Sequence, residues 1–175
     1  GIQSTILISD LTNYYKSRNT PSRTRDFPLG SMQGNYTWSE LNERFDHLRN
    51  LYPDIISDRL IIGESLEGHD IWAFKLSDNP DQDENEPQVL YTGLTHAREP
   101  LSMMNLFYFI QNICENYAAG HDTEATYLVN ERELWFIPVV NPDGYIYNEL
   151  IAPDGGGMHR KNSCLLYTSP SPRDR

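Results

Sequence analysis

A histidine, an arginine and a carboxylate lie within four positions of one another in residues 91–100, which read YTGLTHAREP. Imidazole and carboxylate groups are common zinc ligands, and two histidines with one glutamate and an open position are typical of hydrolytic zinc sites. We therefore interpret His96 and Glu99 as two ligands of a catalytic zinc ion. Arg98, which lies between them in the sequence, is interpreted as a residue that faces the substrate beside the metal.

The spacing alone does not establish a metal site. With 5 histidines and 25 acidic residues among 175 positions, roughly 0.7 pairs with a histidine three residues before a carboxylate arise by chance. The chain has two such pairs, and the second, His121 with Glu124, lies in a polar stretch without supporting context. A surface cluster of ion pairs is therefore the alternative that spacing and loop placement leave open for His96 and Glu99.

The surroundings of His96 and Glu99 favour the metal interpretation. The mostly apolar run at residues 88–92 predicts a buried strand. Gly93 permits a sharp exit from that strand, and Pro100 occupies the first position of a helix, where its missing N–H costs nothing. Apolar residues then follow at helical spacing: Leu101, Met104, Phe107, Tyr108, Ile110, Ile113 and Cys114. The two candidate ligands thus lie on a loop at the carboxyl end of a strand, where open α/β sheets bind ligands.

The rest of the chain alternates strands with helices. A capping box at residues 37–40 begins a helix, and Gly68 lies in the turn of a hairpin. Residues 141–144 (NPDG) match a type I turn. Strands are predicted at 60–65, 71–77, 88–92 and 134–140, and helices at 38–51, 100–117 and 122–130. This pattern predicts an α/β fold with a mixed, largely parallel sheet flanked by helices.

Composition excludes several classes of protein. A hydrophobic content of 38% supports a packed core, and a formal net charge of −11 argues against a nucleic-acid partner, which would need a basic face. No apolar run is long enough to span a membrane. Two cysteines provide neither a disulfide framework nor a cysteine-based metal site. The acidic residues 78–87 lack the ordered ligand spacing of a calcium loop and are interpreted as a solvated surface loop.

Four motifs in order resemble those of the zinc carboxypeptidase family, the carboxypeptidase A-like metallopeptidases. They are residues 63–71 (GESLEGHDI), 96–99 (HARE), 141–144 (NPDG) and 159–162 (HRKN). Each motif is weak by itself, but four in order, each on the expected element, are specific. The resemblance implies a truncated metallocarboxypeptidase-like fold.

The resemblance also divides the chain into three segments. Residues 1–33 are expected to be a linker or the end of a pro-segment, and residues 34–162 the N-terminal part of a catalytic domain. After Asn162 the composition shifts abruptly to serine, proline and arginine. Residues 163–175 are therefore expected to be a non-native tail.

The family resemblance assigns roles to matching residues. It implies that His96 and Glu99 are the first two ligands of Zn²⁺ and that Arg98 helps to bind the substrate. Arg160 matches the arginine that contacts the substrate, polarises the scissile carbonyl and stabilises the oxyanion. His69 stands where many members carry arginine. The implied activity is hydrolysis of the C-terminal bonds of peptides or proteins through a zinc-bound water, in an extracellular or secreted protein.

The family also requires groups that this chain does not provide. The third ligand, a histidine, and the general base, a glutamate, lie downstream of Asn162 in the family. We therefore expect weak zinc binding and no turnover from these 175 residues. Two alternatives remain open: another amide hydrolase on the same fold, such as a deacylase or deglutamylase, and a non-catalytic binding module. Neither the substrate side-chain preference nor the oligomeric state can be predicted from the sequence.

Overall fold

The computed structural model describes residue 10, residues 27–120 and residues 122–162. The predictions for residues 163–175, for His121 and for most of residues 1–33 lie outside this part of the chain. Along the chain the elements are α2 (Trp38–Leu51), β1 (Leu60–Glu64), β2 (Asp70–Leu76), β3 (Gln88–Thr92), α3 (Leu101–Ala119), α4 (Thr123–Asn130), β4 (Glu133–Ile137) and α5 (Pro142–Ile151). The alternation of strands and helices confirms the predicted α/β class.

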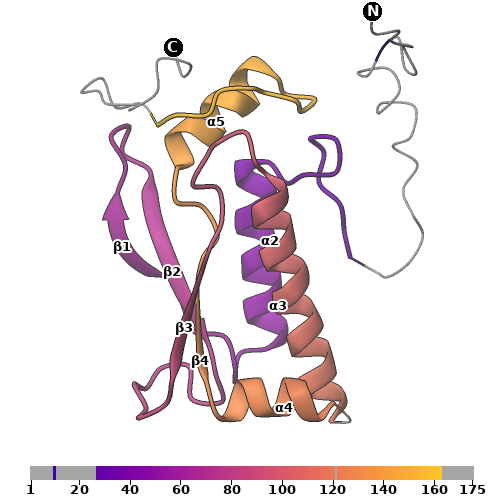
Figure 1. The fold of residues 1–175 in the computed structure, drawn as a ribbon, viewed down its shortest axis with the longest axis vertical. Helices are drawn as coiled ribbons and strands as arrows, with labels where there is room; N and C mark the ends of the chain where they lie inside the picture. The colour runs from indigo at the N-terminus through magenta and orange to yellow at the C-terminus, as the bar shows by residue number, and fades with distance from the viewer. Residues whose placement is uncertain (1–9, 11–26, 121, 163–175) are drawn as a thin grey trace, which may run out of the picture.

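The strands of the described residues form one mixed sheet in the order β1-β2-β4-β3 (Figure 1). The β1–β2 and β2–β4 pairs are antiparallel, and only β3 and β4 run parallel. The mixed sheet is confirmed, whereas the expectation of a largely parallel one was wrong. The β1–β2 hairpin forces one antiparallel pair, and only the connection from β3 through α3 and α4 returns the chain to a parallel neighbour.

Helices α2 and α3 cover one face of the sheet, while α4 and α5 lie at its two ends (Figure 1). The core between sheet and helices is rich in aromatic rings. Phe136 of β4 stacks on Phe74 of β2 and on Tyr91 of β3, with ring centroids 5.2 and 5.3 Å apart. Alternate residues of β2 and β4 point to this core, which is the period-two pattern of strands with one face on a helical layer.

Strand β3 is not buried as the sequence predicted. Val89 and Leu90 are 37% and 58% exposed, although Tyr91 packs between Phe109 and Phe136. The reason is its place in the sheet. Within the described residues β3 is an edge strand, and the helices of Figure 1 cover only one of its faces. An apolar run therefore identified the strand but not its burial.

The helix boundaries follow local sequence signals. Thr37 Oγ1 accepts a hydrogen bond from the Glu40 N–H, and Glu40 Oε2 accepts one from the Thr37 N–H, which confirms the predicted capping box of α2. The predicted turn at residues 141–144 is instead the start of α5. Asn141 Oδ1 accepts the Gly144 N–H at 3.0 Å, and Pro142 occupies the first helical position. A type I turn and a first helical turn share backbone angles, so the motif fits both.

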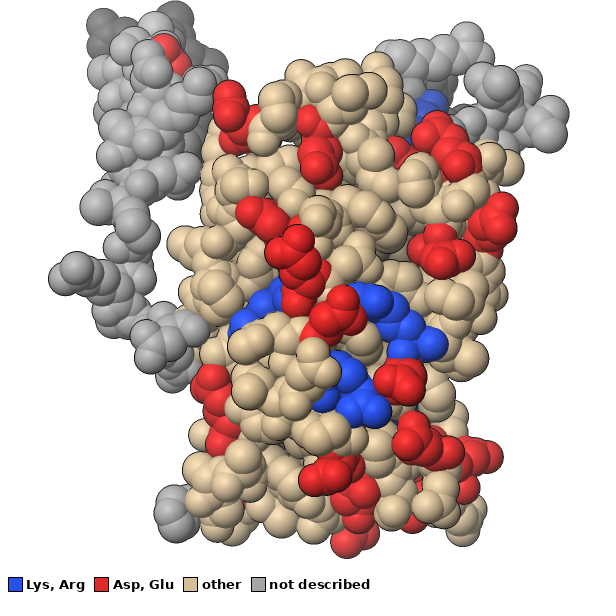
Figure 2. Space-filling model, turned by 180° about the vertical axis from the view of Figure 1, so that it is seen from behind, with Lys and Arg blue, Asp and Glu red and all other residues tan. Residues whose placement is uncertain are grey.

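The surface is predominantly acidic. On the face shown in Figure 2, acidic side chains spread from end to end, and most of the visible basic side chains gather near the centre. Among the described residues, none of the helices combines the length and apolar character needed to cross a membrane.

Candidate metal centre

The candidate metal loop leaves the sheet between β3 and α3. Gly93 donates its N–H to Ile137 O at 2.9 Å, and a Cβ at Gly93 would lie 2.5 Å from Pro138 O. Glycine is thus required here for close approach to the chain after β4. The residue of this loop that adopts the left-handed backbone conformation is Leu94, with φ 48°. Its buried side chain and a hydrogen bond from its N–H to Ser102 Oγ at 2.9 Å hold it in this costly conformation.

The structure brings the two predicted ligands together. His96 Nδ1 lies 3.1 Å from Glu99 Oε2, and the two side chains are 38% and 54% exposed. Two ligands on one tetrahedral zinc ion lie about 3.4 Å apart, so a small opening of this pair would admit zinc. Among the described residues, no third histidine, cysteine or carboxylate joins them. The residues present therefore fit two positions of a zinc site.

Arg160 reaches the same point from a distant part of the sequence. Its Nη2 lies 2.7 Å from His96 Nε2, although the two residues are 64 positions apart. A guanidinium can only donate, so His96 Nε2 accepts and the ring proton lies on Nδ1, directed at Glu99. Zinc bound at Nδ1 would take the place of that proton. The expected proximity of Arg160 to the candidate ligands is thus present.

Arg98 extends from the same loop in a different direction. Its side chain is exposed and lines a hollow of about 170 Å³, whose walls include Asn35, Tyr145 and Met158. This position is compatible with contact to a substrate that lies over the loop.

Helix α5 supports the loop and the segment that carries Arg160. The Asn141 N–H donates to Leu94 O at 3.1 Å, and the Ala97 N–H donates to Arg160 O at 3.1 Å. Gly144 lies where all three segments meet. A Cβ there would collide with Lys161 O and lie 2.8 Å from Ala97 Cβ.

We expect Gly144→Ala to lower the free energy of unfolding by about 1–3 kcal/mol, because the added methyl must push backbone and side chain apart. Urea denaturation measures this change. Gly63→Ala is the matched control, since a Cβ there meets nothing within 4 Å. Equal stability of the two variants would contradict the packing described for α5.

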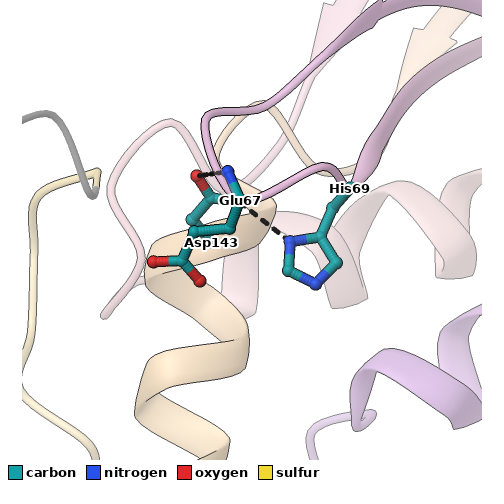
Figure 3. A group of neighbouring side chains, drawn as sticks. All are labelled: Glu67, His69 and Asp143. Carbon is teal, nitrogen blue, oxygen red and sulfur yellow. Dashed lines mark hydrogen bonds and ion pairs between the residues drawn. The ribbon is translucent and has the colours of Figure 1, made fainter.

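A second group of potential ligands was not predicted from the sequence. Glu67 and His69, from the β1–β2 turn, converge with Asp143 from the first turn of α5 (Figure 3). Their candidate ligand atoms lie within 4.8 Å of one another, and among the described residues this is the one group of three. The NPDG motif and the histidine at position 69 were both noted in the sequence. Only the fold shows that they meet.

Hydrogen bonding explains this second group without a metal. Asp143 Oδ1 accepts from Ser65 Oγ and from His69 Nδ1, the latter at 2.9 Å, and Oδ2 accepts the Glu67 N–H at 3.3 Å. Burial raises the pKa of Asp143, but the hydrogen bonds from Ser65, His69 and Glu67 outweigh it and lower the pKa overall. The helix N-terminus also favours an anion over a cation. We therefore interpret these four residues, the Asp143 cluster, as a structural link between hairpin and helix.

Comparison with known proteins agrees with these observations. The sequence model of the family described as zinc carboxypeptidase matches residues 41–166. A zinc carboxypeptidase from Saccharothrix mutabilis subsp. capreolus is 39% identical over 140 residues, which are 79% of this chain and 31% of that protein. The match to the family model confirms the resemblance seen in the four motifs.

Solved structures show the same fold. Thrombin activatable fibrinolysis inhibitor aligns with a TM-score of 0.67 at 22% identity, over 90% of this chain and 37% of that one. Carboxypeptidase A from Helicoverpa armigera aligns with a TM-score of 0.64 at 22% identity, over 89% and 35%. The chain thus spans about a third of the length of these proteins. On the family match over most of its length, this chain belongs to the zinc carboxypeptidase family.

Proposed function

We propose that residues 34–162 are the N-terminal part of the catalytic domain of a zinc metallocarboxypeptidase, which hydrolyses the C-terminal bonds of peptides or proteins. One observation carries the proposal: His96 Nδ1, Glu99 Oε2 and the Arg160 guanidinium converge from two distant segments. A surface contact between His96 and Glu99 would not require a guanidinium from a distant segment at the other ring nitrogen. Family membership supports the same reaction class.

The residues divide the chemistry between them. Zinc, when bound, supplies a Lewis acid that polarises the scissile carbonyl and activates water. His96 and Glu99 would hold two of its positions, and in the metal-free chain Glu99 orients the imidazole through Nδ1. To the Arg160 guanidinium we assign the donation of hydrogen bonds to the carbonyl oxygen as negative charge develops on it; its contact with His96 supports this role. Removing one such donor typically costs about 10²–10³ in kcat. Arg98 offers a positive charge to the substrate backbone over the adjacent hollow.

The proposal has three further parts. The third zinc ligand and the general base belong to a longer protein. Secretion is proposed from the family resemblance. Residues 163–175 are proposed to be non-native, because the composition changes abruptly after Asn162, although the match to the family model extends to residue 166.

For the 175-residue chain we expect weak zinc binding and no hydrolysis of peptide substrates, because only two candidate ligands are in place among the described residues. Zinc titration followed by the ring resonances of His96 measures binding in the wild type and in Glu99→Ala. His96→Ala is followed by calorimetry. His47→Ala, at an exposed histidine of α2, is the control. Both site variants should lose binding, and the control should retain it.

Zinc-dependent cleavage of a peptide by the purified chain would contradict the expected lack of turnover. Wild-type protein that binds no zinc at His96 and Glu99 would contradict the ligand assignment, and the non-catalytic binding module would then be the better interpretation.

A further inference from the structure

Asn148 lies on α5 and is only 5% exposed. It belongs to none of the four sequence motifs. Its side chain makes three hydrogen bonds, all to the backbone of the two segments that carry the candidate site residues. A buried amide with partners for both donors and for its oxygen specifies one arrangement of its neighbours, because any displacement leaves a buried polar group unpaired.

The three bonds use both N–H donors of the amide and one of the two acceptor sites of its oxygen. Oδ1 accepts the His159 N–H at 2.8 Å, and Nδ2 donates to His159 O at 2.7 Å and to Ala97 O at 3.0 Å. The His159 N–H can only donate, so it must face Oδ1, and Nδ2 then faces the two carbonyls. Aspartate has no donor, and serine has one. Among side chains of this length, only asparagine satisfies this position.

We propose that Asn148 is a positioning residue, which holds His96 and Arg160 in register. Ala97 directly follows His96, and His159 directly precedes Arg160, so one amide joins the two backbones beside both functional side chains. The Ala97 N–H to Arg160 O bond reinforces the connection at 3.1 Å. The result is the 2.7 Å contact between Arg160 Nη2 and His96 Nε2. This inference rests on the proposed function for its consequence, but its geometry can be tested separately.

The glycine at position 157 is a second observation in favour of this role. A Cβ there would lie 2.5 Å from Asn148 Oδ1 and 2.7 Å from Asn148 Cβ. The backbone of Gly157 therefore passes against Asn148 at a distance that no other residue permits. The sequence thus supplies both the amide and the space that lets the Arg160 segment approach it.

The register matters because the two groups act on one substrate. A cation that stabilises developing charge must lie within hydrogen-bond distance of the reacting oxygen, and a displacement of about 1 Å can cost about 10²-fold in rate. Without the amide, the Arg160 segment retains its backbone bond from Ala97, but the guanidinium is held less firmly against the imidazole.

The first readout is the tautomer of His96 in the metal-free chain, measured by nitrogen-15 NMR of the imidazole at mildly alkaline pH. In the wild type, Arg160 donates to Nε2 and the proton lies on Nδ1. Asn148→Asp keeps the size and the acceptor but removes both donors. Because Glu99 also holds the proton at Nδ1, this variant and its control are compared in a Glu99→Ala background, where we expect Asn148→Asp to move the proton toward Nε2, the tautomer that free histidine favours. Asn42→Asp is the matched control, since it also removes a donor, the one to Trp38 O, but on α2.

The second readout is the zinc affinity of Asn148→Asp and of Asn42→Asp, each with Glu99 intact. Residues that orient metal ligands change metal affinity by about 10–100-fold, so we expect a loss of that size in Asn148→Asp and less than about twofold in Asn42→Asp. A tautomer that Asn148→Asp leaves unchanged in the folded Glu99→Ala background would overturn the positioning role. Failure of the wild type to bind zinc would instead refute the proposed function and leave the tautomer result standing.

A purely structural role for Asn148 predicts a different result. Stability would fall, but the His96 tautomer would stay as in the wild type whenever the chain is folded. Asn148→Ser and Gly157→Ala cover the case in which Asn148→Asp does not fold. Serine at position 148 retains one hydrogen-bond donor. Gly157→Ala leaves Asn148 itself unchanged and disturbs it from a position outside α5. In the Glu99→Ala background, each should move the His96 tautomer while the resonances of Phe74 and Phe136 in the core remain unchanged, and an unmoved tautomer in both would overturn the proposal.

Discussion

Replacing Lys75 by methionine is expected to lower the free energy of unfolding by about 3–5 kcal/mol, because it leaves a buried carboxylate without its cation. Lys75 Nζ lies 2.8 Å from Glu133 Oε1, and the two side chains are only 2% and 0% exposed. They come from the adjacent strands β2 and β4. Methionine fills a similar volume, so the loss reports the charge rather than a cavity.

The ion pair also anchors the acidic loop at residues 78–87. Lys75 Nζ donates to Gln82 O, and the Glu84 N–H donates to Glu133 Oε1 at 3.0 Å. Gln88 Nε2, at the start of β3, donates to Glu133 Oε2 at 2.6 Å. The sequence predicted a surface loop here but gave no sign of this attachment. Loss of Lys75 should therefore loosen the loop as well as the sheet, which amide hydrogen exchange can detect.

Urea denaturation of Lys75→Met and of the double variant Lys75→Met/Glu133→Gln tests whether the uncompensated charge of Glu133 causes the loss of stability. The double variant should recover part of the loss, because no uncompensated charge remains. A single variant within about 0.5 kcal/mol of the wild type, the usual range for a surface site, would show that the pair contributes little.

Acid should reduce the contribution of this pair. Burial raises the pKa of Glu133, but bonds from Lys75, Glu84 and Gln88 outweigh it and lower the pKa overall. A carboxyl group with a depressed folded-state pKa stabilises the protein above its unfolded pKa, about 4.3 for glutamate, and loses that contribution as pH falls through the folded pKa. The difference in stability between wild type and Lys75→Met should therefore shrink below about pH 4.

Asp143→Ala should cost about 2–4 kcal/mol of unfolding free energy, because it removes the acceptor of three hydrogen bonds at a buried position. Ser65, His69 and the Glu67 N–H would lose their partner, and α5 would lose an anion in its first turn. Since α5 also supports the candidate metal loop, local opening should extend to residues 93–99. Thermal and urea unfolding measure the loss. Asp154→Ala, at an exposed aspartate, is the control and should change stability by less than about 0.5 kcal/mol.

Zinc distinguishes a structural Asp143 cluster from a metal site. In a His96→Ala background, which removes a ligand of the candidate centre, added zinc should leave the melting temperature of the chain unchanged. A zinc-dependent rise that disappears in Asp143→Ala would contradict the structural interpretation.

Acid should weaken the cluster for the same reason as the Lys75 pair. The pKa of Asp143 is lower in the folded chain than in the unfolded chain, where it is about 3.9. Asp143 therefore stabilises the fold above that unfolded pKa, and this stabilisation is lost as pH falls through the folded pKa.

Sequence alone determined the features that depend on neighbours in the chain. The capping box placed the start of α2 at Trp38, and the apolar runs around Gly68 predicted the β1–β2 hairpin. Helical spacing after Pro100 predicted α3 to within two residues at its end. His96 and Glu99 could be paired because a separation of three positions on one loop already holds them close. Such features arise from backbone geometry, caps and side-chain periodicity, which act over a few residues.

Only the tertiary structure decided which distant residues meet. It brings Arg160 to His96 across 64 positions, joins both of their segments through Asn148, and places Asp143 against the turn that carries His69. It also left β3 exposed at an edge, where a run of apolar residues had predicted burial. These outcomes depend on how helices and strands pack and on where buried polar groups find partners. Local patterns in the chain do not contain that information, because the partner of a buried group is set by the fold as a whole.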